Sequence, residues 1–220
     1  MTSVRSISAS SLILAAATAV AAPAFAGDEA PLADAAHAVV GEVIEAAGAE
    51  TVAQSRAILI APLATDAAED HALLSVQLVE GRWSNPLLLR VENNAEEDTV
   101  EDGGHWDLDD ANLVVLAMTE TGLTALTDDD PALGGQYDLA VIHLSSGQTT
   151  VPRLSGFDLI AFTDSRDATA AVREDDVQFL IDPMRNASLY GDYFMVDDIL
   201  GRPNQFALFG GMIETLRTSD

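Results

Sequence analysis

The chain has 220 residues and a formal charge of −26, from 10 basic and 36 acidic residues. This balance excludes a nucleic-acid-binding protein that relies on phosphate attraction over its whole surface. Every basic residue is an arginine and cysteine is absent, which also excludes disulfide scaffolds, cysteine-based zinc sites and thiolate catalysis. A hydrophobic content of 48% argues against wholesale disorder, and the length suits one domain.

The first 26 residues have the pattern of a secretory signal peptide. Arg5 supplies a positive charge, an apolar core runs from Leu12 to about Ala22, and the small-residue exit Ala24-Phe25-Ala26 follows. The apolar core is shorter than the roughly 20 residues that span a bilayer, so a cleaved signal is favoured over an anchor. We therefore expect cleavage near Ala26 and a periplasmic or secreted protein with nine arginines against 36 acidic residues.

The next segments predict a helix followed by a strand. Residues 31–53 place Leu32, Val39 and Val43 on one apolar stripe of a helix, which Gly41 and Gly48 interrupt. The apolar run 57–61 stops at a proline, which cannot extend a hydrogen-bonded ladder. This run predicts a buried strand.

Residues 73–91 predict two strands joined around Glu80-Gly81-Arg82, the second beginning at Pro86. The following segment, 92–110, has nine acidic residues and no basic one. Because like charges repel one another, we expect much of this segment to be a solvated, mobile loop.

A further strand is predicted at 113–118, and Thr119 is placed to cap a short helix that ends at the acidic tract 127–130. Three more apolar runs predict strands: 138–144, 158–162 and 177–181. Residues 205–216 predict an amphipathic closing helix, weakened by two glycines. The predicted fold class is therefore α+β, a mainly antiparallel β domain with short flanking helices.

This pattern divides the chain into four parts. They are the signal peptide (1–26), an N-terminal helical segment (27–49), one domain (50–204) and a C-terminal helix (205–220). The sequence has no internal repeat and no long linker, so a single domain is the economical interpretation.

The candidate catalytic and metal-binding residues form no recognisable constellation. The histidines, at positions 37, 71, 105 and 143, lack the paired spacing of a metal site. We expect His143, in an apolar strand, to be a buried ring rather than a ligand or base. Ser145 follows it without a nucleophile elbow, so a hydrolase triad is unsupported. We predict no catalytic residue, no metal site, no cofactor and no enzymatic activity.

Two acidic tracts and two tryptophans leave alternatives open. Residues 107–110 resemble part of a calcium loop but lack its central glycine and terminal glutamate, so a solvated loop is favoured over a specific site. Weak, collective cation binding by this tract and by 127–130 stays open. Trp83, beside a turn, is typical of a residue that packs at the edge of a core, whereas Trp106 has either a local or an external packing partner.

Four segments follow one another in a recognisable order and spacing: AILIAP (57–62), GRWSNP (81–86), NLVVLAMTETGLTAL (112–126) and the stretch from Asp164-Ser165-Arg166 to Tyr190-Gly191. This order resembles that of the SYLF-domain family, also called lipid-binding SYLF or actin-regulator domains. The match covers about residues 50–204. The motif residues with structural roles in the family correspond to Gly81, Ser84, Pro86, Met118, Tyr190 and Gly191.

The resemblance implies a non-catalytic, mainly β domain with two strands between the Ser-Arg segment and Tyr190. Eukaryotic members of the family bind phosphoinositides or actin. The resemblance thus implies an exported module that binds lipid or envelope components, and we assign Arg166 and Trp83 as its lipid-binding residues. Arg173 and Arg185 could add to a local basic patch around Arg166.

The charge supports a different interpretation. Anionic headgroups attract clusters of lysine and arginine by about 1 kcal/mol per residue, and this chain is strongly acidic. The alternative is an acidic periplasmic structural or interaction protein that binds cations or basic partners. In both interpretations nucleic acid is excluded as a partner, and the protein partners are unknown.

Overall fold

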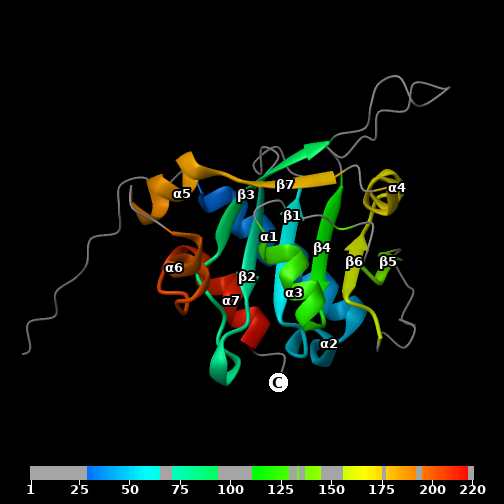
Figure 1. The fold of residues 1–220 in the computed structure, drawn as a ribbon, viewed down its shortest axis with the longest axis horizontal. Coiled ribbons are helices and arrows are strands. Elements are labelled where there is room, and N and C mark those ends of the chain that lie inside the picture. Colours follow the sequence, from blue (N-terminus) through cyan, green and yellow to red (C-terminus); the bar gives the residue numbers. More distant parts are fainter. Residues whose placement is uncertain are drawn as a thin grey trace, which may run out of the picture.

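The computed structural model describes residues 29–64, 71–93, 111–128, 133, 137–144, 156–174, 177–191 and 195–217. These residues form one seven-stranded sheet with helices on both faces (Figure 1). The strands are β1 (Ala57–Pro62), β2 (His71–Val76), β3 (Leu87–Asn93), β4 (Asn112–Ala117), β5 (Leu139–His143), β6 (Leu159–Thr163) and β7 (Val177–Ile181). The helices are α1 (Ala30–Ala47), α2 (Ala49–Ala53), α3 (Glu120–Thr127), α4 (Arg166–Glu174), α5 (Pro183–Tyr190), α6 (Val196–Leu200) and α7 (Gly210–Arg217), with short 3-10 turns at Val79–Gly81 and Ala207–Phe209.

The strand order in the sheet is β5-β6-β4-β1-β2-β3-β7. Every neighbouring pair is antiparallel except β5 and β6, which are parallel. The predicted α+β class with a mainly antiparallel sheet is therefore confirmed. The flanking helices are not all short, since α1 has 18 residues.

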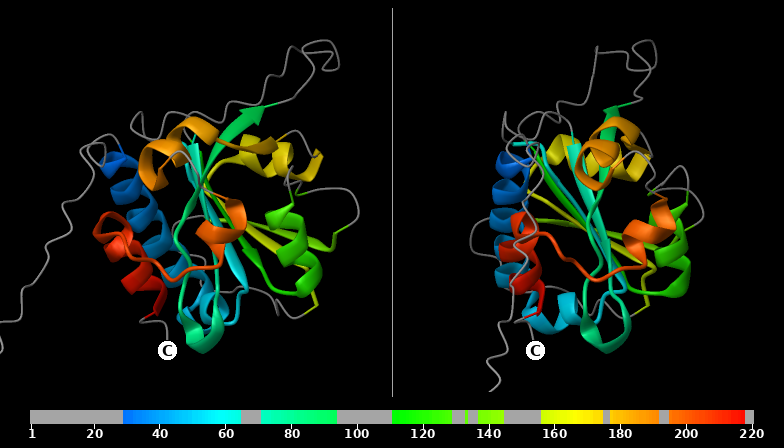
Figure 2. Two further views of the ribbon diagram at one scale, coloured as in Figure 1. Left: turned by 60° about the vertical axis from the view of Figure 1, so that its left-hand side comes forward. Right: turned by 90° about the vertical axis from the view of Figure 1, so that its left-hand side faces the viewer.

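The sheet is buried on both faces around its central strand β1, which is apolar and buried at every position. In β1 the side chains of Ile58 and Ile60 face α1 and α7, whereas Leu59 faces the opposite layer. Figure 2 shows these layers edge-on, with α1 and α7 on one face and α3 and α6 on the other. Alternate side chains of a strand point to opposite faces, so a strand covered on both faces has a continuous apolar run.

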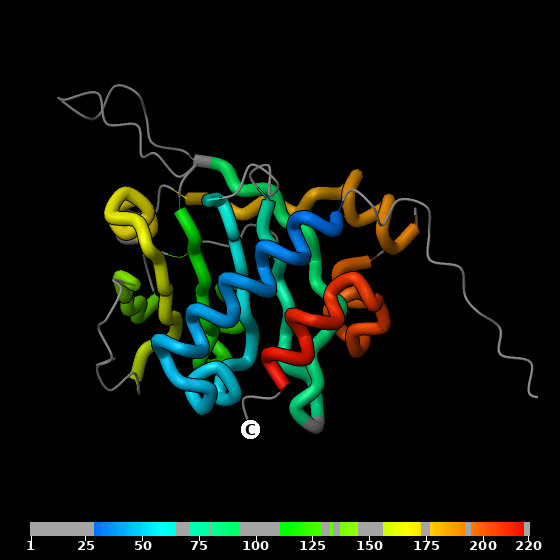
Figure 3. Tube along the Cα trace, turned by 180° about the vertical axis from the view of Figure 1, so that it is seen from behind, coloured from blue at the N-terminus to red at the C-terminus, as the bar shows by residue number. Residues whose placement is uncertain are grey.

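Both ends of the described chain belong to one helical layer. Helix α1 crosses the strands diagonally and α7 lies beside it (Figure 3). The His37 imidazole of α1 is 3.0 Å from the Thr215 hydroxyl of α7. The segments that the sequence separated as 27–49 and 205–220 therefore contribute to the same buried cluster as the sheet.

The ends of the helices follow the local chemistry of the sequence. The predicted helix 31–53 breaks at Gly48, whose φ of 85° favours glycine, and α2 continues after it. The Thr119 hydroxyl accepts a hydrogen bond from the backbone N–H of Gly122 (3.1 Å), which confirms the predicted cap of α3. The closing helix is confirmed too, and it begins at Gly210, one of the two glycines expected to weaken it.

Two predictions, one about His143 and one about the stretch from Ser165 to Tyr190, are wrong. His143, expected to be buried, is exposed at the end of the edge strand β5. Between Ser165 and Tyr190 the chain forms α4, β7 and α5, so one strand stands where the resemblance implies two. Several predictions lie outside the described residues: those for the signal peptide (1–26), for most of the acidic segment 92–110 with Trp106, and for Ser145.

Candidate functional site

The residues assigned to lipid binding are not brought together. Trp83 is only 2% exposed and its ring packs in the cluster beneath α1 and α7. Arg166 is exposed at the start of α4, after β6, and strands β4 and β1 lie between β6 and β2. Helices α4 and α5 lie at opposite ends of β7, so the expected patch of Arg166 with Arg185 does not form (Figures 1 and 3).

The GRWSNP segment makes hydrogen bonds within the described fold. The Ser84 hydroxyl accepts a hydrogen bond from the backbone N–H of Val76 (3.0 Å) and donates one to the Asn85 carbonyl oxygen (2.9 Å). Gly81 has a φ of 67° in the preceding turn, a conformation that favours glycine. These contacts fix the path of the chain between β2 and β3.

The same segment holds the chain that leads to α7. The backbone N–H of Asn85 donates to the Arg202 carbonyl oxygen and that of Asn204 to the Trp83 carbonyl oxygen, both at 2.9 Å. The Asn85 side-chain oxygen accepts from the N–H of Gln205 (3.1 Å). The motif thus joins the β2–β3 connection to the C-terminal segment, which places α7 on the sheet.

The remaining motif residues lie in two places. The Tyr190 hydroxyl donates to the carbonyl oxygen of Pro86, and Gly191, at a φ of 95°, ends α5. Tyr190 also makes an edge-to-face contact with Phe206, with ring centroids 5.1 Å apart. Met118, half-buried after β4, is separated from β2 by β1 in the sheet.

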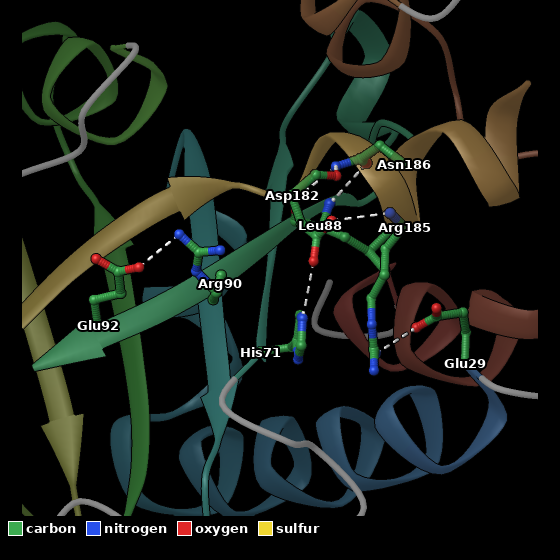
Figure 4. A network of polar contacts seen from close by, with 8 residues as sticks. All are labelled: Glu29, His71, Leu88, Arg90, Glu92, Asp182, Arg185 and Asn186. Carbon is green, nitrogen blue, oxygen red and sulfur yellow. Dashed lines mark hydrogen bonds and ion pairs between the residues drawn. The ribbon is translucent and has the colours of Figure 1, made fainter. Parts of the chain in front are cut away.

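The main concentration of partly buried charge in the described residues lies where β7 meets α5 (Figure 4). We call it the β7–α5 charge network, made of Glu29, His71, Asp182 and Arg185. His71 Nε2 is 3.0 Å from Asp182 Oδ2, and Arg185 Nη1 is 3.2 Å from Glu29 Oε2. The network therefore ties the start of α1 and the start of β2 to the start of α5.

Local chemistry explains why Asp182 begins α5. Its Oδ1 accepts a hydrogen bond from the backbone N–H of Arg185 (2.9 Å), and Pro183 occupies the first turn, where no N–H partner is needed. Burial acts to raise the pKa of Asp182, but the Arg185 N–H and the His71 ring outweigh it. Together they hold the pKa of Asp182 below its usual 3.8.

The environment of Glu29 raises its pKa, whereas that of Asp182 lowers its pKa. Burial raises the pKa of Glu29 above its usual 4.5, although Arg185 and His71 both attract its negative charge. Burial and the charge of Glu29 also raise the pKa of Tyr190 well above 10. In the network the two carboxylates of Glu29 and Asp182 thus face one guanidinium, that of Arg185, and the His71 ring.

The two ion pairs of the network join the ends of three elements, α1, β2 and α5. A His-Asp pair can orient a general base, but a reacting group such as a serine hydroxyl must lie within hydrogen-bond reach of it. The contact described for the His71 ring is the one with Asp182. Within the described residues, no three His, Asp or Glu side chains are grouped as a metal site.

Sequence reasoning missed this network because its members are far apart in the chain. His71 and Asp182 are separated by 111 positions, and Glu29 and Arg185 by 156. The one local signal was Asp182-Pro183, an acidic cap followed by a proline, which is typical of a helix start. It could have located α5 but not the partners of its cap.

The chain was compared with protein-family models, with curated proteins and with solved structures, and no match was found in any of the three. Among the helices of the described part, none combines the length and the apolar character that crossing a bilayer requires.

Proposed function

We propose that the chain is an exported, non-catalytic binding domain whose acidic surface binds basic segments of partner proteins. The proposal rests on one observation: several arginines of the described fold form ion pairs within the chain, whereas many of its exposed carboxylates do not. Arginines are engaged within the molecule: Arg56 with Glu120, Arg90 with Glu92, Arg185 with Glu29 and Arg202 with Asp198. Carboxylates of the same chain thus neutralise the charge of these four arginines.

Many carboxylates, in contrast, face solvent without an arginine. In the described ranges eight exposed acidic residues form no ion pair: Asp34, Glu42, Glu45, Glu50, Asp138, Asp164, Asp167 and Asp197. They lie on α1, α2, α4 and α6 and beside β5 and β6, on both sides of the sheet. Such a surface attracts cationic partners from many directions and raises their local concentration.

The same distribution makes an anionic lipid surface the weaker candidate. Each basic residue near an anionic membrane contributes about 1 kcal/mol, and a patch of several is needed for stable attachment. Arg166 stands between Asp164 and Asp167 in the sequence, and the ring of Trp83 is buried. The Trp83 ring therefore does not face a membrane surface, and the sequence neighbours of Arg166 are acidic residues that would oppose its attraction to anionic lipid.

The proposal can be tested with the mature chain, residues 27–220, and two kinds of probe. A labelled arginine-rich peptide should bind at low salt and weaken as salt rises, whereas a glutamate-rich peptide of equal length should not bind. In vesicle flotation, neither anionic nor neutral vesicles should retain the chain. Retention by anionic vesicles at low and high salt, with no peptide binding, would favour the lipid-binding interpretation instead.

A further inference from the structure

The outer edge of β5 has backbone groups that its neighbour β6 does not pair with, and such groups can pair with another strand. The N–H of Leu144 donates to the Thr163 carbonyl oxygen (2.6 Å), and the Asp138 carbonyl oxygen accepts from the N–H of Leu159 (3.1 Å). Positions 138 and 144 therefore face β6, and by the alternation of a strand so do 140 and 142. The N–H and C=O groups of Leu139, Val141 and His143 point away from the sheet.

Within the residues that the structure describes, β5 carries few of the features that usually protect an edge strand against pairing. Natural edge strands are protected by charged residues, prolines, bulges or a covering segment. Residues 139–142 are Leu-Ala-Val-Ile, all half-exposed, and β5 is the terminal strand of the sheet in the described residues. At the other edge, β7 carries a glutamine and ends at the charged Asp182.

The side chains of β5 form two incomplete apolar layers. Val141 packs against the cluster on the α3 and α4 side, and Ile142 packs against the cluster on the α1 side. Because both remain half-exposed, an added strand with apolar residues on each face would extend both layers.

The charge around the edge indicates what kind of strand fits. Asp138 is exposed immediately before β5, and Asp164 and Asp167 are exposed where the parallel neighbour β6 ends. Arg166 is the basic residue that the structure describes at that end. Carboxylates thus flank both ends of an uncharged strand, a pattern complementary to an apolar segment with basic residues at its ends.

We propose that the basic partner binds by adding a β-strand to the outer edge of β5. This inference rests on the proposed function and names the surface it uses. Backbone hydrogen bonds from the three outward residues supply affinity, and the flanking carboxylates select basic ends. A second copy of this chain is the poorer occupant, because each mature copy has nine arginines against 36 acidic residues and the flanking carboxylates would meet one another.

The probe is a short peptide of alternating valine and threonine with arginines at both ends. Hydrogen exchange of the mature chain, with and without peptide, is followed at the amides of Leu139, Val141 and His143. We expect these amides to exchange rapidly in the free chain and slowly in the complex. A peptide of the same sequence N-methylated at alternate residues should bind about tenfold more weakly or worse, since it loses one or more backbone hydrogen bonds.

The variant Val141→Pro removes an outward N–H that the sheet does not use, so the fold should be retained. It should weaken peptide binding by about tenfold or more. The comparison variant Val141→Thr changes the same side chain but keeps the N–H, so it should weaken peptide binding much less than Val141→Pro does. The N-methylated peptide provides the same test even if the proline variant fails to fold.

The other outcomes separate the two proposals. If arginine-rich peptides bind but the N-methylated peptide and Val141→Pro change nothing, the proposed function stands and the assignment of the edge is overturned. If no arginine-rich peptide binds, both fall. Slow exchange of the three amides in the free chain would mean that the chain covers its own edge. Self-association detected by light scattering and abolished by Val141→Pro would assign the edge to a second copy instead.

Discussion

Asn186 of α5 takes the place of a strand partner for Leu88 of β3. Its side-chain oxygen accepts the N–H of Leu88 (3.0 Å), and its Nδ2 donates to the Leu88 carbonyl oxygen (2.7 Å). Strand β7 pairs with β3 only as far as Ile181, opposite Leu89. The amide of Asn186 therefore satisfies the backbone where the ladder ends, and it fixes α5 to the edge of β3.

Substitution of Asn186 by alanine should destabilise the fold. The Leu88 carbonyl oxygen keeps the N–H of Asp182 (3.1 Å), but the buried N–H of Leu88 loses its partner. Leaving one buried donor unsatisfied costs about 1–3 kcal/mol, measurable as a lower free energy of unfolding in urea. Ser188→Ala, an exposed change in the same helix, is the control and should leave that free energy within about 0.5 kcal/mol. Equal stability of both variants would contradict the role of Asn186.

The charge of Asp182 should stabilise the fold above its usual pKa. Because its pKa is lowered in the folded state, the contribution is present above pH 3.8 and is lost as the pH falls through the lowered value. Asp182→Asn keeps a capping side chain but removes the charge that attracts His71. Urea unfolding over a pH series should show the parent more stable than this variant at pH 7 and the two converging in acid. A constant difference at every pH would contradict this reasoning.

Glu29 should show the opposite pH dependence. Its raised pKa means that the folded state favours the protonated form, so its contribution is complete below pH 4.5 and is lost as the pH rises through the raised value. Glu29→Gln keeps an oxygen acceptor for Arg185 and removes this loss. Relative to the parent, the variant should therefore gain stability between pH 4.5 and pH 7. Asp34→Asn, an exposed change on α1, serves as the control and should show no such trend.

Two glycines in helices should respond to alanine in opposite directions. At Gly122 in α3 an added Cβ would lie 2.1 Å from the Asp158 carbonyl oxygen, which also accepts the N–H of Met118. The backbone must shift, at a cost of about 1–3 kcal/mol. At Gly41 in α1 nothing lies within 4 Å of the added atom, so alanine should stabilise the helix by about 1 kcal/mol. Thermal unfolding of Gly122→Ala and Gly41→Ala would measure both changes in stability. A change of the same sign in the two variants would contradict the packing described around these glycines.

The elements that could be predicted from sequence are those whose cause is local. The strand at 177–181 was predicted from its apolar run, and the cap at Thr119 from its position before a helix. Helix α4 was missed, although Ser165 accepts hydrogen bonds from the N–H groups of Asp167 (3.2 Å) and Ala168 (3.4 Å), as a capping serine does.

The candidate site was less predictable because it depends on which strands become neighbours. His143 lies in an apolar run, yet it is exposed because β5 is the terminal strand of the sheet. His71, which gave no local signal, is buried beside Asp182 because β2 lies next to β3, and β3 next to β7. The order of the strands thus decides that His143 is exposed and that His71 is buried, and a single sequence does not reveal strand order.

Trp83 offers a direct test of whether the GRWSNP segment contacts lipid or the interior. In a Trp106→Phe chain, Trp83 is the remaining tryptophan, and its 2% exposure predicts blue-shifted emission with little quenching by iodide. Addition of anionic vesicles should leave this emission unchanged. Trp83→Ala should lower the free energy of unfolding by about 3–5 kcal/mol, whereas Arg166→Ala, at an exposed site, should change it by no more than about 0.5 kcal/mol. A vesicle-dependent shift of the emission, lost on substitution of Arg166, would instead place both residues at a lipid surface.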